Sequence, residues 1–237
     1  LPASEVLKFR DHAFKKYFAD QSYLEYVERR FGGDTLADIR DMSSHQLERK
    51  FAAAWTSVER STRVYVAGAD TLIGAAIVTA LRRDGYDVLD GVGEVEVARP
   101  ASVRQFFQRQ RPEHVIVAAG RSAGITGNQR FPADLMHDNL LIATHVIHEA
   151  WQAGATRLMF LASSCSYPKL APQPMRPDSL LTGPLEPTSQ SYAVAKLAGI
   201  QMCAAYNRQH GVEFFAAIPA DGFGPGDDFS PEDSHVV

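Results

Sequence analysis

The chain of 237 residues has only two cysteines, Cys165 and Cys203, and neither has a partner at a spacing typical of a metal site. We therefore expect no disulfide framework and no bound metal, as in proteins of a reducing cytoplasm. The longest apolar runs, such as residues 115–119, fall far short of the about 20 residues that a membrane-spanning helix needs. Residues 1–5 show no signal-peptide pattern. These absences predict a cytoplasmic protein without a membrane partner.

A strong excess of one charge is also missing. Lysine and arginine together number 24 and aspartate and glutamate 28, so the formal net charge is −4. A chain this weakly acidic has no bulk attraction for nucleic acid or anionic lipid, and we expect neither as a partner. The hydrophobic share of 45% and the charged share of 22% are typical of a folded globular protein.

The first sixty residues contain no strand-like run. Apolar residues recur at three- and four-residue steps, for example at Leu24, Val27 and Phe31, and this pattern predicts short amphipathic helices. Two glycines end this helix, and a serine cap at Ser43 predicts the start of a further one. We predict that residues 1–60 form a helical appendage, whose role the sequence does not indicate.

From residue 61 onward, short apolar runs alternate with helical patterns. The predicted strands are 63–67, 88–89, 114–119, 157–162 and 214–218, and the predicted helices are 72–83, 102–110, 132–151 and 189–209. Strands that are apolar on both faces and alternate with helices indicate a parallel sheet covered on both sides. We therefore predict an α/β fold for residues 61–237, a doubly wound parallel sheet of the Rossmann type.

A glycine-containing turn follows the first predicted strand, where a Rossmann sheet places its phosphate-binding loop. Gly68 permits a tight turn and Gly74 allows close packing, while the new helix would aim its N–H groups at a pyrophosphate. Thr71 stands where this loop usually has glycine. A plain strand–turn–helix without a ligand is the alternative. The predicted cofactor contacts in this loop are Gly68, Asp70, Thr71, Leu72, Ile73 and Gly74.

An acidic residue ends the second predicted strand. Asp90 lies about twenty residues beyond Gly68, where a carboxylate accepts hydrogen bonds from the adenosine ribose and repels a 2′-phosphate. This position favours NAD(H) over NADP(H). Alternatively, Asp90 simply begins a turn with the glycine that follows it. Arg82 and Arg83, at the end of the preceding helix, would moderate the preference for NAD(H).

A tyrosine and a lysine four residues apart form the next signal. On a helix, Tyr192 and Lys196 share one face. An ammonium group beside a phenol lowers the phenol pKa, so that Tyr192 could protonate a carbonyl oxygen while hydride reaches the carbon. Ser163 follows the strand 157–162, at the sheet edge where ligands bind, and could hold the same oxygen. A solvent-exposed Tyr–Lys pair without function is the alternative.

These segments resemble the extended short-chain dehydrogenase/reductase family, whose members act on nucleotide sugars. Within it, they are similar to the enzymes that epimerise C3 and C5 of GDP-4-keto-6-deoxy-mannose and reduce C4. The resemblance covers residues from about 63 to 237. Its most specific segments are Ser163-Ser164-Cys165-Ser166-Tyr167-Pro168-Lys169, Leu185-Glu186-Pro187-Thr188 and Asp233-Ser234-His235.

The resemblance implies a role for each candidate catalytic residue. Cys165 matches the base and His235 the acid of the epimerisation, in which protons next to the C4 carbonyl are removed and replaced. Ser163 and Tyr192 would hold and protonate the C4 oxygen, and Lys196 would tune Tyr192 and bond the nicotinamide ribose. A cysteine after a strand is otherwise small core filler, and a histidine near a chain end is otherwise solvated. We expect the second cysteine of the chain to be core.

The resemblance also implies partners and further cofactor contacts. The cofactor of the family is NADP(H), the substrate would be a GDP-linked keto-deoxy sugar, and a homodimer is implied. At the end of the third predicted strand, the implied cofactor contacts are Ala118, Ala119 and Gly120.

The sequence departs from the family pattern in three places. Asp70 and Thr71 stand where the family has a basic residue and a glycine, and Asp90 replaces a basic contact to the 2′-phosphate. The chain stops at Val237, where the family continues into a C-terminal lobe that binds the substrate. We therefore expect that lobe to be absent and this chain alone to be inactive as an oxidoreductase and epimerase. A non-catalytic Rossmann scaffold or partner-binding module is the alternative function.

Overall fold

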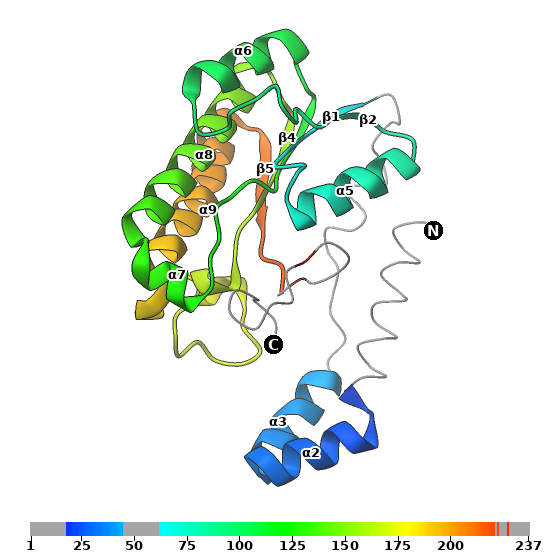
Figure 1. Cartoon of the computed structure of the whole chain (residues 1–237), viewed down its shortest axis with the longest axis vertical. Helices are drawn as coiled ribbons and strands as arrows, with labels where there is room; N and C mark the ends of the chain where they lie inside the picture. The colour runs from blue at the N-terminus through cyan, green and yellow to red at the C-terminus, as the bar shows by residue number, and fades with distance from the viewer. Residues whose placement is uncertain (1–17, 45–61, 221, 223–226, 228–237) are drawn as a thin grey trace. The chain divides into compact units, whose positions relative to one another are not determined.

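The computed structural model describes residues 18–44, 62–220, 222 and 227 (Figure 1). The chain divides into two compact units, Leu1–Val58 and Glu59–Val237. The predicted catalytic residue His235 lies outside the described residues, and so do the parts of the predicted appendage before residue 18 and after residue 44.

The described part of the first unit consists of two helices, α2 (Gln21–Phe31) and α3 (Gly33–Ser44). The Asp20 carboxylate caps α2, and Val27 is its buried residue, which confirms the helix predicted from the apolar spacing. Ser43 lies in the last turn of α3, and the further helix predicted to start there lies outside the described residues. No proline or glycine interrupts the sequence after Gly33, so the helix continues through the serines.

The second unit is built on five parallel strands. They are β1 (Arg63–Ala67), β2 (Asp87–Leu89), β3 (His114–Val117), β4 (Arg157–Leu161) and β5 (Glu213–Ala217). Their order in the sheet is β2-β1-β3-β4-β5. The chain first moves from β1 to β2 and then crosses back to β3 on the other side of β1. Ligands of open α/β sheets bind outside the carboxyl ends of the strands at such a reversal.

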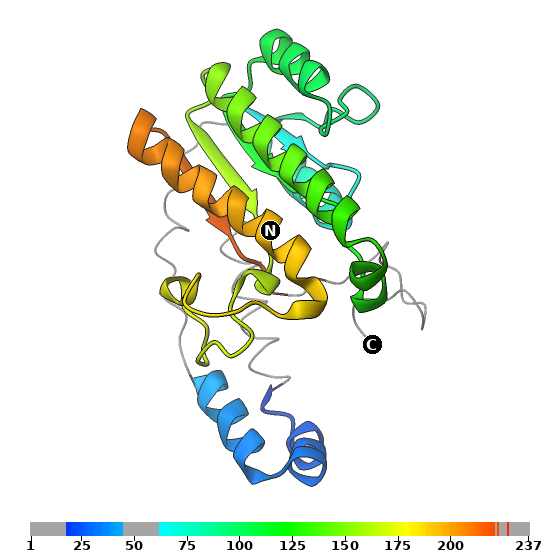
Figure 2. The ribbon, with the colours of Figure 1, turned by 90° about the vertical axis from the view of Figure 1, so that its left-hand side faces the viewer.

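Helices cover both faces of this sheet. They are α5 (Leu72–Arg83), α6 (Pro100–Gln110), α7 (Ile125–Arg130), α8 (Pro132–Gln152) and α9 (Gln190–His210). Figure 1 shows α5 on one face and α6, α8 and α9 on the other, and Figure 2 shows α8 and α9 side by side. This arrangement confirms the predicted doubly wound fold. None of the helices in the described residues is long and apolar enough to cross a membrane.

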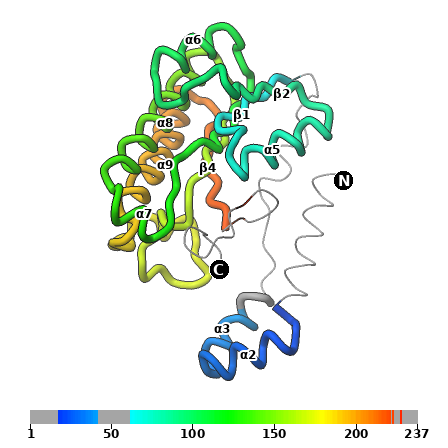
Figure 3. The backbone as a smooth tube through the Cα atoms, viewed as in Figure 1, coloured from blue at the N-terminus to red at the C-terminus, as the bar shows by residue number. Residues whose placement is uncertain are grey.

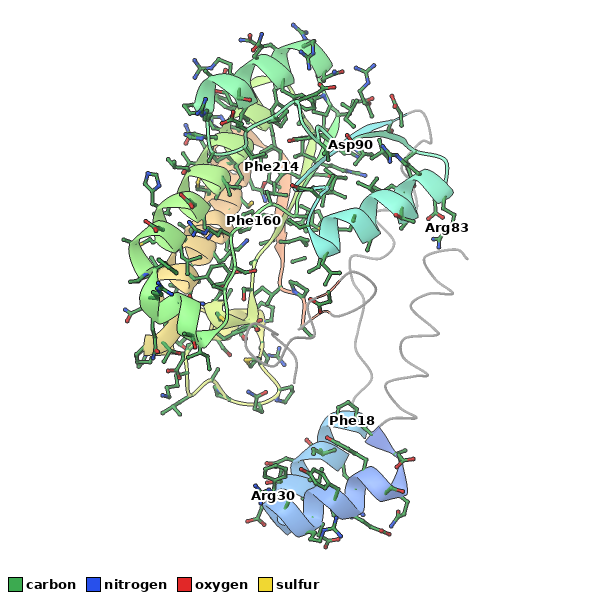
Figure 4. All side chains as sticks on the ribbon, viewed as in Figure 1. Phe18, Arg30, Arg83, Asp90, Phe160 and Phe214 are labelled. Atoms are coloured by element: carbon green, nitrogen blue, oxygen red, sulfur yellow. The ribbon has the colours of Figure 1, made fainter. Side chains whose placement is uncertain are left out.

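Large aromatic side chains fill the core between the sheet and its helices. Tyr65 of β1 meets Phe107 of α6 edge to face, with ring centroids 5.4 Å apart. Phe160 and Phe214 lie under the pair α8 and α9 (Figure 4), and both are buried. Cys203 is 2% exposed in the same core, and burial raises the pKa of its thiol to about 12. The prediction that this cysteine is core is confirmed.

The connection from β4 to α9 is long and irregular (Figure 3). It contains three short 3-10 turns, at Ser164–Ser166, Pro177–Ser179 and Pro187–Ser189. The first turn carries the predicted catalytic cysteine, and the third leads directly into the helix with the predicted tyrosine and lysine. The residues after the carboxyl end of β4 and those at the start of α9 therefore lie near one another.

Candidate functional site

The turn after β1 brings three backbone segments into direct contact. Gly68 has a φ of +81°, and a methyl group there would collide with the backbone of Ala119. A methyl group on Gly74 would collide with the carbonyl oxygen of Gly68. Only glycine allows β1, the first turn of α5 and the end of β3 to pack this closely.

Thr71 caps the helix that follows. Its hydroxyl donates to the carbonyl oxygen of Gly68 at 2.7 Å and accepts the N–H of Gly74 at 3.1 Å. Thr71 has a φ of −78°, so no glycine is needed at this position. One of the N–H groups that a helix start can offer to a phosphate is therefore already paired within the protein.

Replacing the capping threonine is expected to destabilise this turn. Thr71→Ala removes the acceptor for the Gly74 N–H, and loss of such a cap costs about 1 kcal/mol of unfolding free energy. Thr71→Ser keeps the hydroxyl and is the matched control, with stability close to wild type. Urea unfolding followed by circular dichroism measures both. An alanine variant as stable as the serine variant would show that the cap does not stabilise the fold.

A cavity of about 390 Å³ lies at the carboxyl ends of β1, β2 and β3. It brings together half of the predicted cofactor contacts. Ala118 instead donates its N–H to the carbonyl oxygen of Ala67, and Leu72 and Ile73 lie in the first turn of α5. Predicted residues that line the cavity are Gly68, Asp70, Thr71, Asp90, Ala119 and Gly120.

Both oxygens of the Asp90 carboxylate have partners. The Arg82 guanidinium donates to one oxygen at 2.7 Å, and the Val92 N–H donates to the other at 3.2 Å. The bond from Arg82 holds the Asp90 pKa below its usual range. The turn interpretation of Asp90 is thus confirmed, and the same carboxylate also holds Arg82 beside the cavity. Arg83 pairs instead with Asp84, at 3.0 Å.

Lys196 lies behind Gly120, one of the residues that line this cavity. Its side chain is buried, and its ammonium group donates to the carbonyl oxygen of Leu161 at 3.1 Å. A methyl group on Gly120 would lie 2.9 Å from the Lys196 Nζ atom, so the ammonium group abuts a residue that lines the cavity. Burial lowers the Lys196 pKa to about 8.

Three further predicted side chains gather next to this lysine. Ser163 hydrogen-bonds the Tyr192 hydroxyl, and the Ser163 Oγ atom also accepts the N–H of Cys165 at 3.3 Å. The Lys196 Nζ atom lies 5.7 Å from the centre of the Tyr192 ring. The structure therefore brings together Ser163, Cys165, Tyr192 and Lys196, although they come from two segments about thirty residues apart.

The predicted acidity of the tyrosine is wrong. Burial raises the pKa of Tyr192, the hydrogen bond with Ser163 lowers it, and the nearby Cys165 raises it again, with a net shift upward. The Lys196 ammonium group donates to a backbone oxygen and lies over the face of the Tyr192 ring. Desolvation of the phenol therefore outweighs the hydrogen bond with Ser163 and keeps the Tyr192 pKa above its usual value. The phenol is protonated at neutral pH and is able to donate a proton.

A buried asparagine was missed by the sequence interpretation. The Asn139 side chain donates to the carbonyl oxygens of Arg121 and Leu135, at 2.8 and 2.7 Å, and accepts the N–H of Arg121 at 3.2 Å. It fixes the loop after β3 next to Lys196 and Gly120. Its signal was present in the sequence, because a polar residue lies on the apolar stripe of a helix four residues after Leu135.

The two most specific segments of the family resemblance also meet in space. Lys169, in the segment that begins with Ser163, forms an ion pair with Glu186 at 2.9 Å. The Lys169 N–H also donates to the carbonyl oxygen of Pro184 at 2.9 Å. The loop that carries Cys165 is thus tied to the segment that leads into α9.

A larger cavity of about 550 Å³ lies at the opposite edge of the sheet. It is lined by the first residues of three strands, His114, Arg157 and Glu213, and by Trp151. None of the predicted site residues within the described part of the chain lines it. Because the glycine turn, Lys196 and Tyr192 all lie at the carboxyl edge, the smaller cavity marks the candidate site.

Comparisons with known proteins identify the family of this chain. The model of the NAD dependent epimerase/dehydratase family matches residues 64–237. GDP-L-fucose synthase 1 of Arabidopsis thaliana is 45% identical over 181 residues, which are 76% of this chain and 56% of that protein. GDP-L-fucose synthase of Escherichia coli K12 is 42% identical over 177 residues, 74% of this chain and 55% of that protein.

A solved structure is similar over the same region. It is CJ1428, a GDP-D-glycero-L-gluco-heptose synthase from Campylobacter jejuni, determined in the presence of NADPH. The TM-score is 0.71 and the identity 29%, with 76% of this chain and 53% of that chain covered. The chain spans about half the length of the curated relatives it matches.

Proposed function

Because the chain belongs to the NAD dependent epimerase/dehydratase family, we propose that it binds NADP(H) and contributes to the 3,5-epimerisation and 4-reduction of a GDP-linked 4-keto-6-deoxy sugar. The curated relatives named above are GDP-L-fucose synthases, and the solved relative acts on a GDP-linked heptose. These names support a GDP-sugar substrate, and the NADPH of the solved relative supports the cofactor.

One observation carries this proposal. Ser163, Cys165 and Tyr192 meet at the carboxyl end of β4, and Lys196 lies between them and Gly120, which lines the 390 Å³ cavity. A cavity that holds a glycine turn and lies next to a Tyr–Lys–Ser group suits a redox nucleotide whose reactive ring must reach a substrate. A scaffold has no physical need for a buried lysine beside a half-buried tyrosine.

The residues present fit a nicotinamide cofactor. The close packing of Gly68 on the backbone of Ala119 sets the start of α5 at this cavity, where its N–H groups would hold a pyrophosphate. Lys196 would bond the nicotinamide ribose. When bound, the cofactor supplies the hydride that reduces the sugar at C4.

The side chains of this protein carry out the proton transfers at the C4 oxygen and at C3 and C5. Tyr192, protonated at neutral pH, donates its proton to the C4 oxygen, and Ser163 holds that oxygen through its hydroxyl. The hydrogens at C3 and C5 are acidic because they neighbour the carbonyl group. Cys165 removes them, and His235 returns a proton from the opposite face; the role of His235 stays a prediction.

The remaining expectations stay proposals. Residues 61–237 form the NAD(P)-binding domain and residues 1–60 a helical appendage, and the protein works in the cytoplasm as a homodimer. A non-catalytic scaffold is the second candidate function. It is favoured by Thr71, which occupies an N–H group at the phosphate end of the cavity, and by Asp70, whose carboxylate lines the same cavity.

Titration with NADPH separates the two functions. We expect saturable binding, seen as a change in nicotinamide fluorescence, with a Kd in the micromolar range that is common for such cofactors, on the order of 1 μM to 1 mM. In a preparation with measurable turnover, adding GDP-4-keto-6-deoxy-mannose in deuterium oxide should then give exchange at C3 and C5, observed by proton NMR.

The control is Gly68→Val, whose side chain would collide with the backbone of Ala119 and displace the turn, and which should abolish NADPH binding. Circular dichroism checks that this variant is folded. If the wild-type protein binds neither NADPH nor NADH, the enzyme proposal fails and the scaffold function stands.

A further inference from the structure

The charge of the nucleotide cavity poses a problem for a phosphate-rich ligand. Three carboxylates line it, those of Asp70, Asp90 and Asp138. Among the described residues that line the cavity, Arg121 is the single cation, and its guanidinium is paired with Asp138 at 3.0 Å. A nucleotide with an additional 2′-phosphate would meet net negative charge unless another cation reached it.

Arg82 supplies a further cation next to Asp90. It projects from the last turn of α5, and its Nη2 atom lies 2.7 Å from the Asp90 carboxylate. Asp90 follows β2, at the place where a Rossmann sheet reads the ribose hydroxyls of the adenosine. The cation is therefore held next to Asp90, beside the place where such a sheet binds the adenosine ribose.

The pair is built so that Arg82 can change partners. The side chain of Arg82 is 54% exposed and that of Asp90 38% exposed, and ion pairs in water are weak. A guanidinium has five donors, and the structure gives only one bond from Arg82 to Asp90. Asp90 keeps the N–H of Val92 as a partner when Arg82 turns to a phosphate.

We propose that Arg82, positioned by Asp90, binds the 2′-phosphate of the cofactor and makes the protein prefer NADP(H) despite an aspartate at the end of β2. This inference rests on the proposed cofactor binding. It resolves the conflict between Asp90, which by itself favours NAD(H), and a relative whose structure was determined with NADPH.

The neighbouring arginine offers a matched control. Arg83 has the same charge and lies in the same last turn, but it pairs with Asp84 at 3.0 Å. Figure 4 shows Arg83 at the end of α5, apart from Asp90. A variant of Arg83 changes the net charge as much as a variant of Arg82 and leaves the pair with Asp90 in place.

The test compares Kd values for NADPH and NADH, measured by nicotinamide fluorescence. The two molecules differ only in the 2′-phosphate. Arg82→Gln should therefore raise the Kd for NADPH about 10- to 100-fold, as expected for lost hydrogen bonds to a charged group. The Kd for NADH should change less than about threefold in this variant. Arg83→Gln should leave the Kd values for both nucleotides nearly unchanged. Asp90→Asn removes a carboxylate next to the phosphate and should strengthen NADPH relative to NADH.

Several results of these measurements would overturn the inference about Arg82. Arg82→Gln weakening NADPH and NADH equally, or Arg83→Gln weakening NADPH as much as Arg82→Gln, overturns the inference while leaving cofactor binding intact. A wild-type protein that prefers NADH also overturns it. Failure of the wild-type protein to bind either nucleotide overturns the proposed function itself and the inference with it. Thermal unfolding of each variant confirms that these exposed substitutions leave the fold unchanged.

Discussion

Replacing Lys196 by methionine is expected to make the protein more stable at pH 7, by about 1–3 kcal/mol in unfolding free energy. Burial lowers the pKa of this lysine from 10.5 to about 8. One pKa unit corresponds to about 1.4 kcal/mol, so keeping the ammonium charged in the folded protein costs on the order of 3 kcal/mol. Methionine keeps an unbranched apolar side chain near the Phe160 ring, and the lost bond to Leu161 offsets about 1 kcal/mol.

The pH dependence of this gain has a definite sign. Between about pH 8 and pH 10.5, the unfolded chain carries a proton on Lys196 that the folded protein lacks, so wild-type stability gains from Lys196 as pH rises through this window. The stability advantage of Lys196→Met is therefore full below pH 8 and shrinks above it. When the unfolding free energy of wild type is subtracted from that of Lys196→Met, the contributions of the titrating groups that both proteins share cancel.

Urea unfolding of both proteins at several pH values measures this effect. Lys169→Met is the control, because Lys169 is half-exposed and paired with Glu186, so its loss should give no gain. A Lys196→Met protein less stable than wild type at pH 7 would mean that the buried ammonium group is better solvated than its surroundings indicate. The same variant should lose cofactor binding, because the charge next to the cavity is kept for function at a cost in stability.

Much of the fold could be predicted because its elements have strong local signals. The helix predicted at 72–83 has the observed bounds of α5, since a capping threonine and two arginines mark its ends. The helix α7 (Ile125–Arg130) was missed because six residues with a glycine inside carry no periodic pattern. The extension of α6 back to Pro100 was also missed, although proline is favoured in a first helical turn.

For the candidate site, the sequence predicted only the features that follow from the spacing of residues along a helix. Four residues on a helix put Tyr192 and Lys196 on one face, but spacing says nothing about burial, and burial reversed the expected pKa shift of the phenol. The partnership of Arg82 with Asp90 joins a helix end to a strand end, and no local pattern encodes it. Asn139 was not recognised because its partners lie on a loop that only the fold brings to it.

Cys165→Ser is expected to separate the two halves of the proposed reaction. In a preparation with measurable turnover, it should slow deuterium exchange at C3 and C5 of the GDP-linked keto sugar by about 10²- to 10⁴-fold, the usual contribution of a positioned acid or base. A serine hydroxyl is far less acidic than a thiol and is a poor proton carrier at neutral pH. Reduction at C4 should fall much less, because Ser163 and Tyr192 are untouched.

Tyr192→Phe should give the opposite result, with reduction lowered by about 10²- to 10⁴-fold and exchange largely kept. The Tyr192 hydroxyl is the group that hydrogen-bonds Ser163, and phenylalanine keeps the ring that packs beneath Lys196. Cys203→Ala is the control for loss of a thiol, because Cys203 is buried in the core and should affect stability alone. Proton NMR follows exchange, and NADPH absorbance follows reduction.

The two variants together test whether the group at the end of β4 works as two proton-transfer sites or as one. Cys165 lies close enough to Tyr192 to shift its pKa, so each residue alters the electrostatic surroundings of the other. If that coupling dominated, both variants would lose exchange and reduction in equal measure, and Cys165 would have no separate role as the epimerisation base. Opposite losses would mean that one carbonyl oxygen, held by Ser163, serves two proton transfers that use different residues.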